Sequence, residues 1–284
     1  MPTHSNADLM AAPLVVVRSA SDIGSAAAHA LKGAGFAPLL LERAEPGATR
    51  RRMSFAGAVF TGQAELEGQR AVRCASPEET AAMADEVNVI PLLVLNREDD
   101  APAVLETLGK LRPVAALVDA RMRKKARPEG QMHLATFVVG IGPGFIAGEQ
   151  AHVVVESNWG DRLGHVIHTG GAEEYTGQHR VIAGKGAERY VYSPVAGRFD
   201  TAMDVGGVVR EGSTVATVDG TPLRVESAGI LRGLAYPGVH VAAGAKVAEV
   251  DPTGDPANCA GIAARPAAIA WGVVQALRER LSAE

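Results

Sequence analysis

The residues best suited to chemistry stand in one glycine-rich run, from Phe137 to Phe145. An apolar, β-branched stretch ends there, and glycines follow at Gly140, Gly142 and Gly144. Glycine adopts backbone angles that other residues avoid, and it lets main-chain N–H groups converge on a bound anion. The run therefore predicts a loop that holds a phosphate or a carboxylate. A tight turn after a strand, without a ligand, is the alternative.

Two basic clusters could supply positive charge for such a ligand. One is the run 49–55, with three consecutive arginines, and the other is the run 119–125, which follows an apolar stretch. Ligands of open α/β sheets bind beyond the carboxyl ends of the strands, where we expect the second run to lie. For the arginine run, a solvated charged face is an equal alternative. The candidate contacts in the two clusters are Arg50, Arg51, Asp119, Arg121 and Lys124.

The loop after the first expected strand partly resembles a dinucleotide-binding fingerprint. That fingerprint is Gly-x-Gly-x-x-Gly, whereas this chain has Ser19, Ser21 and Gly24 at the three positions. Glu42 ends the next strand, where an acidic residue would meet a ribose hydroxyl. A nucleotide site and a scaffold of the same shape without a cofactor both fit this pattern.

The cysteines and histidines indicate no metal site. Cys74 and Cys259 lie far apart, and His165 and His168 have no zinc-type spacing with other ligands. Cys259 precedes the last helical segment, and a thiol near a helix N-terminus can have a lowered pKa and act as a nucleophile. It is therefore a candidate reactive residue, and buried packing is the alternative.

Composition excludes several classes of protein. The chain has 284 residues and a net charge of −4, which gives no electrostatic basis for nucleic-acid binding. No apolar run approaches the roughly 20 residues that span a bilayer, so no membrane partner is expected. The segment 1–12 lacks the basic start and apolar centre of a signal peptide, and a cytoplasmic location is the expectation.

The first half of the chain predicts an α/β domain. The apolar run 13–17, a helical stretch at 23–34 and a second apolar run at 37–41 form a βαβ unit, which implies parallel strands. Ser76 followed by Pro77 predicts a capped helix start. We therefore expect a Rossmann-like, doubly wound parallel sheet over residues 13–187.

The second half predicts a small all-β domain over residues 188–254. Glycine turns separate short valine strands, and a phrase near 193–199 is echoed about 33 residues later. This half resembles the barrel-sandwich domains of biotinyl and lipoyl carriers. The hairpin 218–223, where a carrier has its modifiable lysine, contains none, so we expect no covalent biotin or lipoate. A helix over 263–282 is expected to pack back on the α/β domain.

Several motifs follow one another along nearly the whole chain. They are Thr49-Arg50-Arg51, Val118-Asp119-Ala120-Arg121-Met122, Gly140-Ile141-Gly142-Pro143-Gly144, Glu156-Ser157-Asn158-Trp159-Gly160, Pro194-Val195-Ala196-Gly197, Asp251-Pro252-Thr253-Gly254 and Cys259. Together they resemble the accessory-protein family tied to selenium-dependent molybdenum hydroxylases. That family tends to read Lys-Gly-Ala-Gly-Asp at its first loop, where this chain keeps only Asp22.

The resemblance implies a maturation factor for a molybdenum hydroxylase. Such a factor would bind the molybdenum cofactor (molybdopterin) or a precursor and aid its modification or insertion. Phosphates would lie on the glycine run, Asp22 and Asp119 would orient polar groups, and Cys259 would be the candidate for sulfur handling. The partner would be the client enzyme, and a homo-oligomer is left open. A nucleotide-dependent oxidoreductase with a degenerate Rossmann fingerprint and a purely structural partner of the client are the alternatives.

Overall fold

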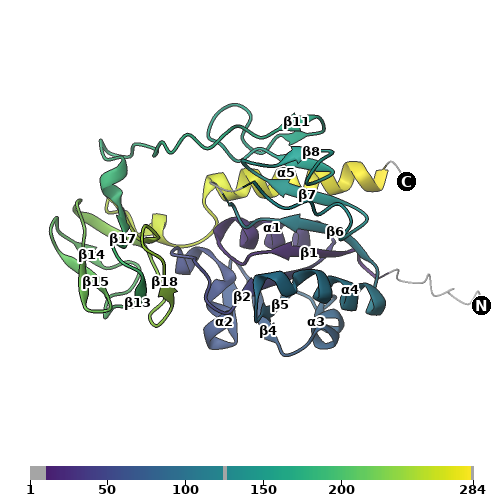
Figure 1. Ribbon diagram of the computed structural model, residues 1–284, viewed down its shortest axis with the longest axis horizontal. Coiled ribbons are helices and arrows are strands. Elements are labelled where there is room, and N and C mark those ends of the chain that lie inside the picture. The colour runs from purple at the N-terminus through teal and green to yellow at the C-terminus, as the bar shows by residue number, and fades with distance from the viewer. Residues whose placement is uncertain (1–10, 124–126, 283–284) are drawn as a thin grey trace, which may run out of the picture.

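The first half of the chain is built around one nine-stranded sheet (Figure 1). The computed structural model describes residues 11–123 and 127–282, and the strand order in this sheet is β10-β9-β7-β6-β1-β2-β5-β4-β3. All pairs from β9 across to β4 are parallel, whereas the edge strands β3 and β10 run antiparallel to their neighbours. The strands are β1 (Leu14–Arg18), β2 (Ala37–Arg43), β3 (Gln63–Leu66), β4 (Gln69–Cys74), β5 (Val89–Leu95), β6 (Val114–Asp119), β7 (Val138–Ile141), β9 (Val153–Val155) and β10 (Val166–Ile167).

Helices cover both faces of this sheet. Along β1, Val15 and Val17 pack with side chains of α1 and α5, and Leu14 and Val16 pack with those of α4. A strand buried on both faces needs a continuous apolar run, which β1 provides. Within the described residues, no helix has the length and apolar character needed to cross a membrane. The helices are α1 (Asp22–Gly33), α2 (Ala58–Thr61), α3 (Pro77–Met83), α4 (Ala101–Leu111) and α5 (Ala264–Ser282), with 3-10 turns η1 (Arg51–Met53), η2 (Phe55–Gly57), η3 (Glu98–Asp100), η4 (Ala187–Arg189) and η5 (Pro256–Cys259).

The mixed sheet corrects the predicted fold class, and the connection between β3 and β4 gives one physical reason. Glu67 and Gly68 join these strands with φ angles of +46° and +79°. Two residues with positive φ make the tight turn of an antiparallel hairpin, whereas parallel strands need a much longer crossover. At the other edge β10 pairs with β9 antiparallel. The prediction of a Rossmann-like, doubly wound parallel sheet is therefore wrong.

Residues 190–251, called the β domain below, form two four-stranded sheets with antiparallel pairing and a shared apolar core. The strand orders are β12-β19-β17-β14 and β16-β15-β13-β18. Each sheet keeps two open edges, so among the described residues no barrel closes, and the predicted biotinyl/lipoyl-like barrel-sandwich class is wrong. The strands are β12 (Tyr190–Tyr192), β13 (Gly197–Asp200), β14 (Val208–Val209), β15 (Thr214–Val218), β16 (Thr221–Arg224), β17 (Gly229–Leu234), β18 (His240–Val241) and β19 (Lys246–Asp251), and a separate two-stranded sheet joins β8 (Ile146–Ala147) to β11 (Gly170–Gly171).

The β domain lies at one end of the molecule and packs against the segment that follows β2 (Figure 1). The Leu234 N–H donates to the Thr49 carbonyl at 2.7 Å, and Arg51 Nε donates to the Leu234 carbonyl at 2.8 Å. The rings of Phe60 and Tyr236 stack with centroids 4.6 Å apart. We call this contact region between the β domain and the large sheet the seam.

Candidate functional site

A buried glutamate collects cations at the seam. Glu249, on β19, is 0% exposed and accepts both Nε and Nη2 of Arg50 at 3.1 Å each. Arg189 Nη2 and Lys246 Nζ each donate to the same carboxylate at 3.2 Å. Burial alone would raise the pKa of Glu249, but Lys246 and Arg50 outweigh burial, so the pKa lies far below its usual value. Glu249 is therefore ionised and holds the seam together.

Arg50 links this glutamate to the first turn of α1. Its Nη1 donates to Asp22 Oδ2 at 2.7 Å, and Asp22 is the first residue of the helix. Burial raises the pKa of Asp22, but the positive charges of Arg50, Lys246 and Arg265 lower it by more. The pKa of Asp22 therefore lies below its usual value. A carboxylate in a first helical turn also interacts favourably with the helix dipole.

Arg232 lies beside this network, but its Nε makes no hydrogen bond to any of its members. On β17, Leu231 pairs with Val250 and Gly233 pairs with Glu249, so Arg232 is the extra residue of a β-bulge. Bulges commonly redirect a side chain next to a functional site. The Arg232 side chain is only 12% exposed, its Nε lies 4.0 Å from Glu249 Oε1, and that buried Nε has no hydrogen-bond partner in the described structure. Burial lowers its pKa, and the nearby charge of Arg50 lowers it further.

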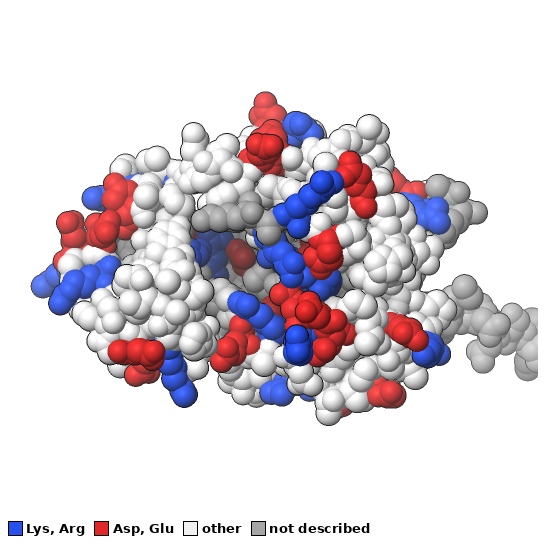
Figure 2. Space-filling view, viewed as in Figure 1, with Lys and Arg blue, Asp and Glu red and all other residues white. Residues whose placement is uncertain are grey.

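Arg265 brings a fifth cation from the start of α5. Its Nε donates to the Ser157 carbonyl at 2.7 Å, and burial lowers its pKa. Figure 2 shows the molecule hollowed between the β domain and the sheet, with basic side chains gathered inside the hollow. We call the whole group the seam site. Its members are Asp22, Arg50, Arg189, Arg232, Lys246, Glu249 and Arg265.

Stability is expected to fall as the pH drops below about 4.5, because Asp22 and Glu249 have lowered pKa values in the fold. In the unfolded chain such carboxyl groups titrate near about 4. Between the unfolded and folded pKa values the unfolded state binds more protons, so acid favours unfolding. Urea unfolding midpoints at pH values of about 6, 4 and 3 would measure the effect. A midpoint that stays constant or rises toward acid would contradict this account.

The predicted glycine cradle has internal contacts that account for its glycines. A Cβ on Gly140 would lie 2.4 Å from the Phe145 ring, and a Cβ on Gly142 would lie 2.5 Å from Ser157 Oγ. The Gly142 N–H, which could have faced a ligand, donates to the Val155 carbonyl at 3.0 Å. Gly142 and Gly144 have φ angles of +81° and +90°, as the turn requires. Anion binding by this run stays a prediction.

The second predicted cluster is neutralised by its own carboxylates. Asp119 is 2% exposed and accepts from Arg121 Nε at 3.0 Å and from Gln131 Nε2 at 2.6 Å. Arg121 also donates to Glu98 at 2.7 Å and to Glu129 at 2.6 Å. Burial raises the pKa of Glu129, but hydrogen bonding to Arg121 outweighs it and lowers the value to about 2. Lys124 lies outside the described residues.

Two other predicted residues lie near the seam site but are used in packing the β domain. Arg51 donates to the carbonyls of Leu234 and Ala235 and so fastens the β domain. Cys259 is 2% exposed, with Sγ 3.6 Å from the Leu231 carbonyl, and burial raises the pKa of its thiol. A raised pKa makes the reactive thiolate scarcer. The described residues contain no group of three or more metal-binding side chains.

The loop after β1 is hydrogen-bonded to Glu42, the acidic residue near the end of β2. Glu42 Oε2 accepts from the Ala20 N–H at 2.7 Å and from Ser19 Oγ at 3.2 Å, and burial raises its pKa. Ser19 has φ +97°, and a Cβ on Gly24 would lie 1.9 Å from the Ser19 carbonyl oxygen. Glu42, on β2, is thus bonded to the loop that follows β1, whereas a dinucleotide enzyme would use it on a ribose.

Sequence reasoning found Asp22 and Arg50 but missed five members of the seam site. Arg50 and Glu249 are 199 residues apart, and no local spacing connects them. One signal was available, because β19 begins at Lys246 and places Glu249 between the buried apolar residues Ala248 and Val250. A charged residue in a buried run needs a partner. The missed residues are Arg189, Arg232, Lys246, Glu249 and Arg265.

Comparisons with known proteins give one similar sequence and several weakly similar structures. No family model matches the chain. The uncharacterized protein YqeB of Escherichia coli (strain K12) is 35% identical over 264 residues, which are 93% of this chain and 47% of YqeB. The chain therefore spans about half the length of this curated relative.

The solved structures found are desuccinylase and aspartoacylase proteins. A succinylglutamate desuccinylase/aspartoacylase from Rhodobacter sphaeroides is 35% identical but covers 23% of this chain and 22% of its own, with a TM-score of 0.21. The ectoine utilization protein EutE (DoeB) from Ruegeria pomeroyi, in its apo form, is 14% identical over 84% of this chain and 86% of its own, with a TM-score of 0.24. An aspartoacylase family protein from Mesorhizobium loti is 12% identical over 84% of each chain, with a TM-score of 0.26.

These comparisons contradict the family predicted from the motifs. The reported proteins are YqeB and desuccinylase or aspartoacylase proteins, and none is described as an accessory protein of a molybdenum hydroxylase. The predictions of a maturation factor and of a hydroxylase client are therefore wrong, and so is the alternative of a nucleotide-dependent oxidoreductase. A molybdenum cofactor as ligand stays a prediction that nothing tests.

Proposed function

We propose that the chain binds a small, multiply charged anion at the seam site. The observation that carries the proposal is Arg232, a largely buried guanidinium whose Nε has no hydrogen-bond partner in the described structure. Buried polar groups in folded proteins nearly always have partners, supplied by the protein, by water or by a ligand. An oxyanion is the natural partner of a guanidinium, since two parallel N–H groups match two oxygens.

The charge balance of the site supports the proposal. Five cationic side chains face the carboxylates of Asp22 and Glu249. Two more carboxylates act from outside, Asp251 on Arg232 and Glu156 on Arg265. Even with these counted, the cations outnumber the acids. An added anion would offset the repulsion that Arg50 exerts on Arg232 and Arg265.

The cations divide into two kinds. Arg50 and Arg189 donate their hydrogen bonds to Asp22, Glu249 and backbone carbonyls, so their role is structural. Lys246 is 33% exposed and has three N–H donors, one of which bonds Glu249. Arg232 and Arg265 likewise keep N–H groups beyond their described contacts. We assign ligand contact to Arg232, Lys246 and Arg265, at the place where α1 and α5 begin.

Isothermal titration calorimetry of the purified chain with pyrophosphate, succinate and acetate would test the proposal. The wild type is expected to bind at least one of the two multiply charged probes, pyrophosphate or succinate, with a Kd well below 1 mM, about tenfold or more tighter than acetate. Arg232→Met should weaken that binding by about tenfold or more, because it removes a charge-assisted contact.

The control is Arg210→Met, which removes an exposed arginine elsewhere on the β domain and should bind like the wild type. The proposal fails if no probe binds more tightly than acetate, or if the Arg232 and Arg210 variants bind alike. A cytoplasmic location remains part of the proposal, supported by two buried, unpaired cysteines.

A further inference from the structure

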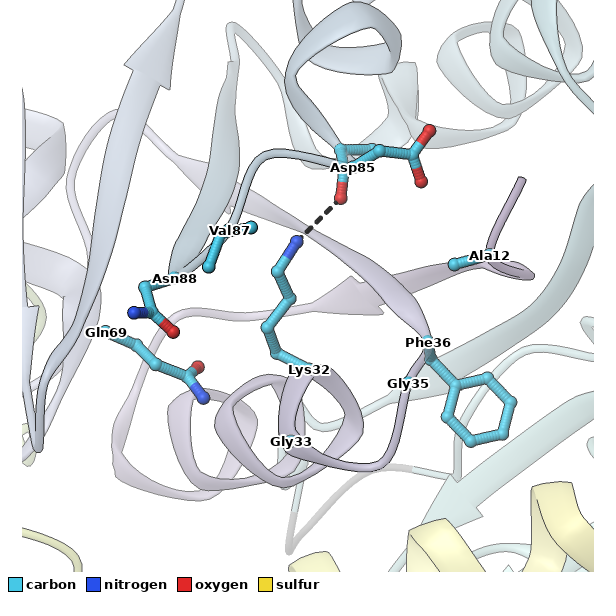
Figure 3. Close-up of a pocket in the computed structure, with 10 residues that line it drawn as sticks. Ala12, Lys32, Gly33, Gly35, Phe36, Gln69, Asp85, Val87 and Asn88 are labelled. Atoms are coloured by element: carbon cyan, nitrogen blue, oxygen red, sulfur yellow. Dashed lines mark hydrogen bonds between the residues drawn. The ribbon is translucent and has the colours of Figure 1, made fainter. Parts of the chain in front are cut away.

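A pocket lies at the end of the large sheet where the parallel strands begin, whereas the seam site follows the ends of β1 and β2. The pocket has a volume of about 270 Å³ (Figure 3). The end of α1, the first residue of β4 and the turn before β5 form its walls, with Lys32, Gln69 and Asn88 among the lining residues. In Figure 3, the Gln69 amide points toward the Lys32 side chain, and the Asn88 amide lies next to Gln69. The seam site and its ligand play no part here.

Gln69 supplies a buried acceptor without a partner. The residue is 7% exposed, and its Nε2 donates to the His29 carbonyl at 3.1 Å. Because a carbonyl only accepts, this bond fixes which end of the amide is nitrogen. Oε1 then faces the pocket side, and within the described residues this buried atom has no hydrogen-bond partner. A group that donates a hydrogen bond would satisfy it.

Lys32 supplies donors beside that acceptor. Its Nζ donates to the Ala84 carbonyl at 2.8 Å, the bond drawn dashed in Figure 3. An ammonium group has three N–H donors, so this bond leaves two for a ligand. The same pocket therefore offers donors and an orphan acceptor, and a matching ligand must carry both an acceptor and a donor.

The charges around the pocket select among such ligands. Asp85, Glu86 and Arg112 are the groups that act on the charge of Lys32. Arg112 donates two hydrogen bonds to the Asp85 carboxylate, from Nη1 at 2.8 Å and from Nη2 at 3.1 Å. Two cations thus stand against two anions, and the pocket is close to neutral. A neutral ligand that is a donor at one end and an acceptor at the other avoids a charge penalty there.

We propose that this pocket binds a small α-amino acid as its zwitterion. Its carboxylate accepts hydrogen bonds from Lys32 Nζ, and its ammonium donates to Gln69 Oε1. The volume is below the roughly 300–1,000 Å³ of sites for drug-sized ligands, which fits amino acids with small side chains.

Calorimetric titration with glycine, L-alanine and L-serine tests the proposal, with propionate and ethylamine as probes that each lack one charged end. We expect at least one amino acid to bind with a Kd near or below about 1 mM, and both half-probes to bind at least tenfold more weakly. Gln69→Leu and Lys32→Met should each weaken amino-acid binding at least tenfold. Lys110→Met changes a lysine on α4 that is 71% exposed, and should have no effect.

Three outcomes would overturn the proposal. If no amino acid binds, Oε1 is satisfied by an ordered water only. If propionate binds as tightly as alanine, the ammonium contact does not exist. If Gln69→Leu, checked for folding by circular dichroism, binds as the wild type does, the acceptor has no role. The half-probe comparison needs only the wild-type chain, so it decides the matter even where a variant fails to fold.

Discussion

Replacement of Glu249 by glutamine is expected to lower the free energy of unfolding by about 3–5 kcal/mol. The carboxylate is fully buried, and three cationic side chains donate hydrogen bonds to it. Glutamine keeps the volume but removes the negative charge, so the loss comes from cations left buried without their counter-ion rather than from a cavity. Urea unfolding of both proteins near neutral pH measures the difference.

Arg232→Met is the matched control within the same cluster. Arg232 lies 4.0 Å from Glu249, and its buried Nε makes no hydrogen bond in the described structure. Because Arg50 repels it, its removal is expected to change the free energy of unfolding by less than about 1 kcal/mol, or to raise stability. Equal losses in the two variants would show that bulk packing, rather than charge pairing, stabilises the seam.

The contrast between these variants separates building residues from binding residues. Glu249 and Arg50 join segments 199 residues apart, so they determine how the β domain sits on the sheet. Arg232 adds little to that joint and is held at it by a bulge. A residue whose loss removes ligand binding while stability survives is the pattern expected of a ligand contact.

The elements that local sequence determines were predicted well. The strand expected at 13–17 lies at Leu14–Arg18, the helix expected at 23–34 is Asp22–Gly33, and β1 pairs with β2 in parallel as predicted. Ser76 caps α3, accepting from the Glu79 N–H at 3.3 Å, with Pro77 at the first position. Each of these features depends on residues a few positions apart, which is the range at which sequence patterns are informative.

The features that depend on distant partners were not predicted. The antiparallel edge strands contradict the predicted all-parallel sheet. The turn Glu67-Gly68 between β3 and β4 was the one local indication of a hairpin. Arg232 looks like an ordinary polar position in a strand, because a bulge becomes visible only when its partner strand is known. The basic run at 119–125 was expected to face a ligand, but Glu98 and Glu129 from other segments neutralise Arg121.

Gly24→Ala is expected to cost about 2–3 kcal/mol of stability, an overpacking effect near the upper end of its usual range. A Cβ at this position would lie 1.9 Å from the Ser19 carbonyl oxygen, which belongs to the backbone. That backbone is fixed, because the Ser19 N–H donates to the Leu41 carbonyl at 2.8 Å. Relief would require α1 to move away from β1, and Asp22 would move with it. Thermal and urea unfolding measure the loss, and anion titration reports whether the seam site is disturbed.

Gly33→Ala makes the same chemical change at the other end of α1 and serves as the control. A Cβ on Gly33 meets nothing within 4 Å, so only helix propensity acts, and a gain of up to about 1 kcal/mol is expected. Opposite signs for the two substitutions would show that Gly24 is required by the close approach of loop and helix. A loss at both positions would mean that α1 tolerates no added methyl group, and the contact with Ser19 would then explain nothing. A gain at both would mean that the loop yields easily, and Asp22 would not be held firmly enough to position Arg50.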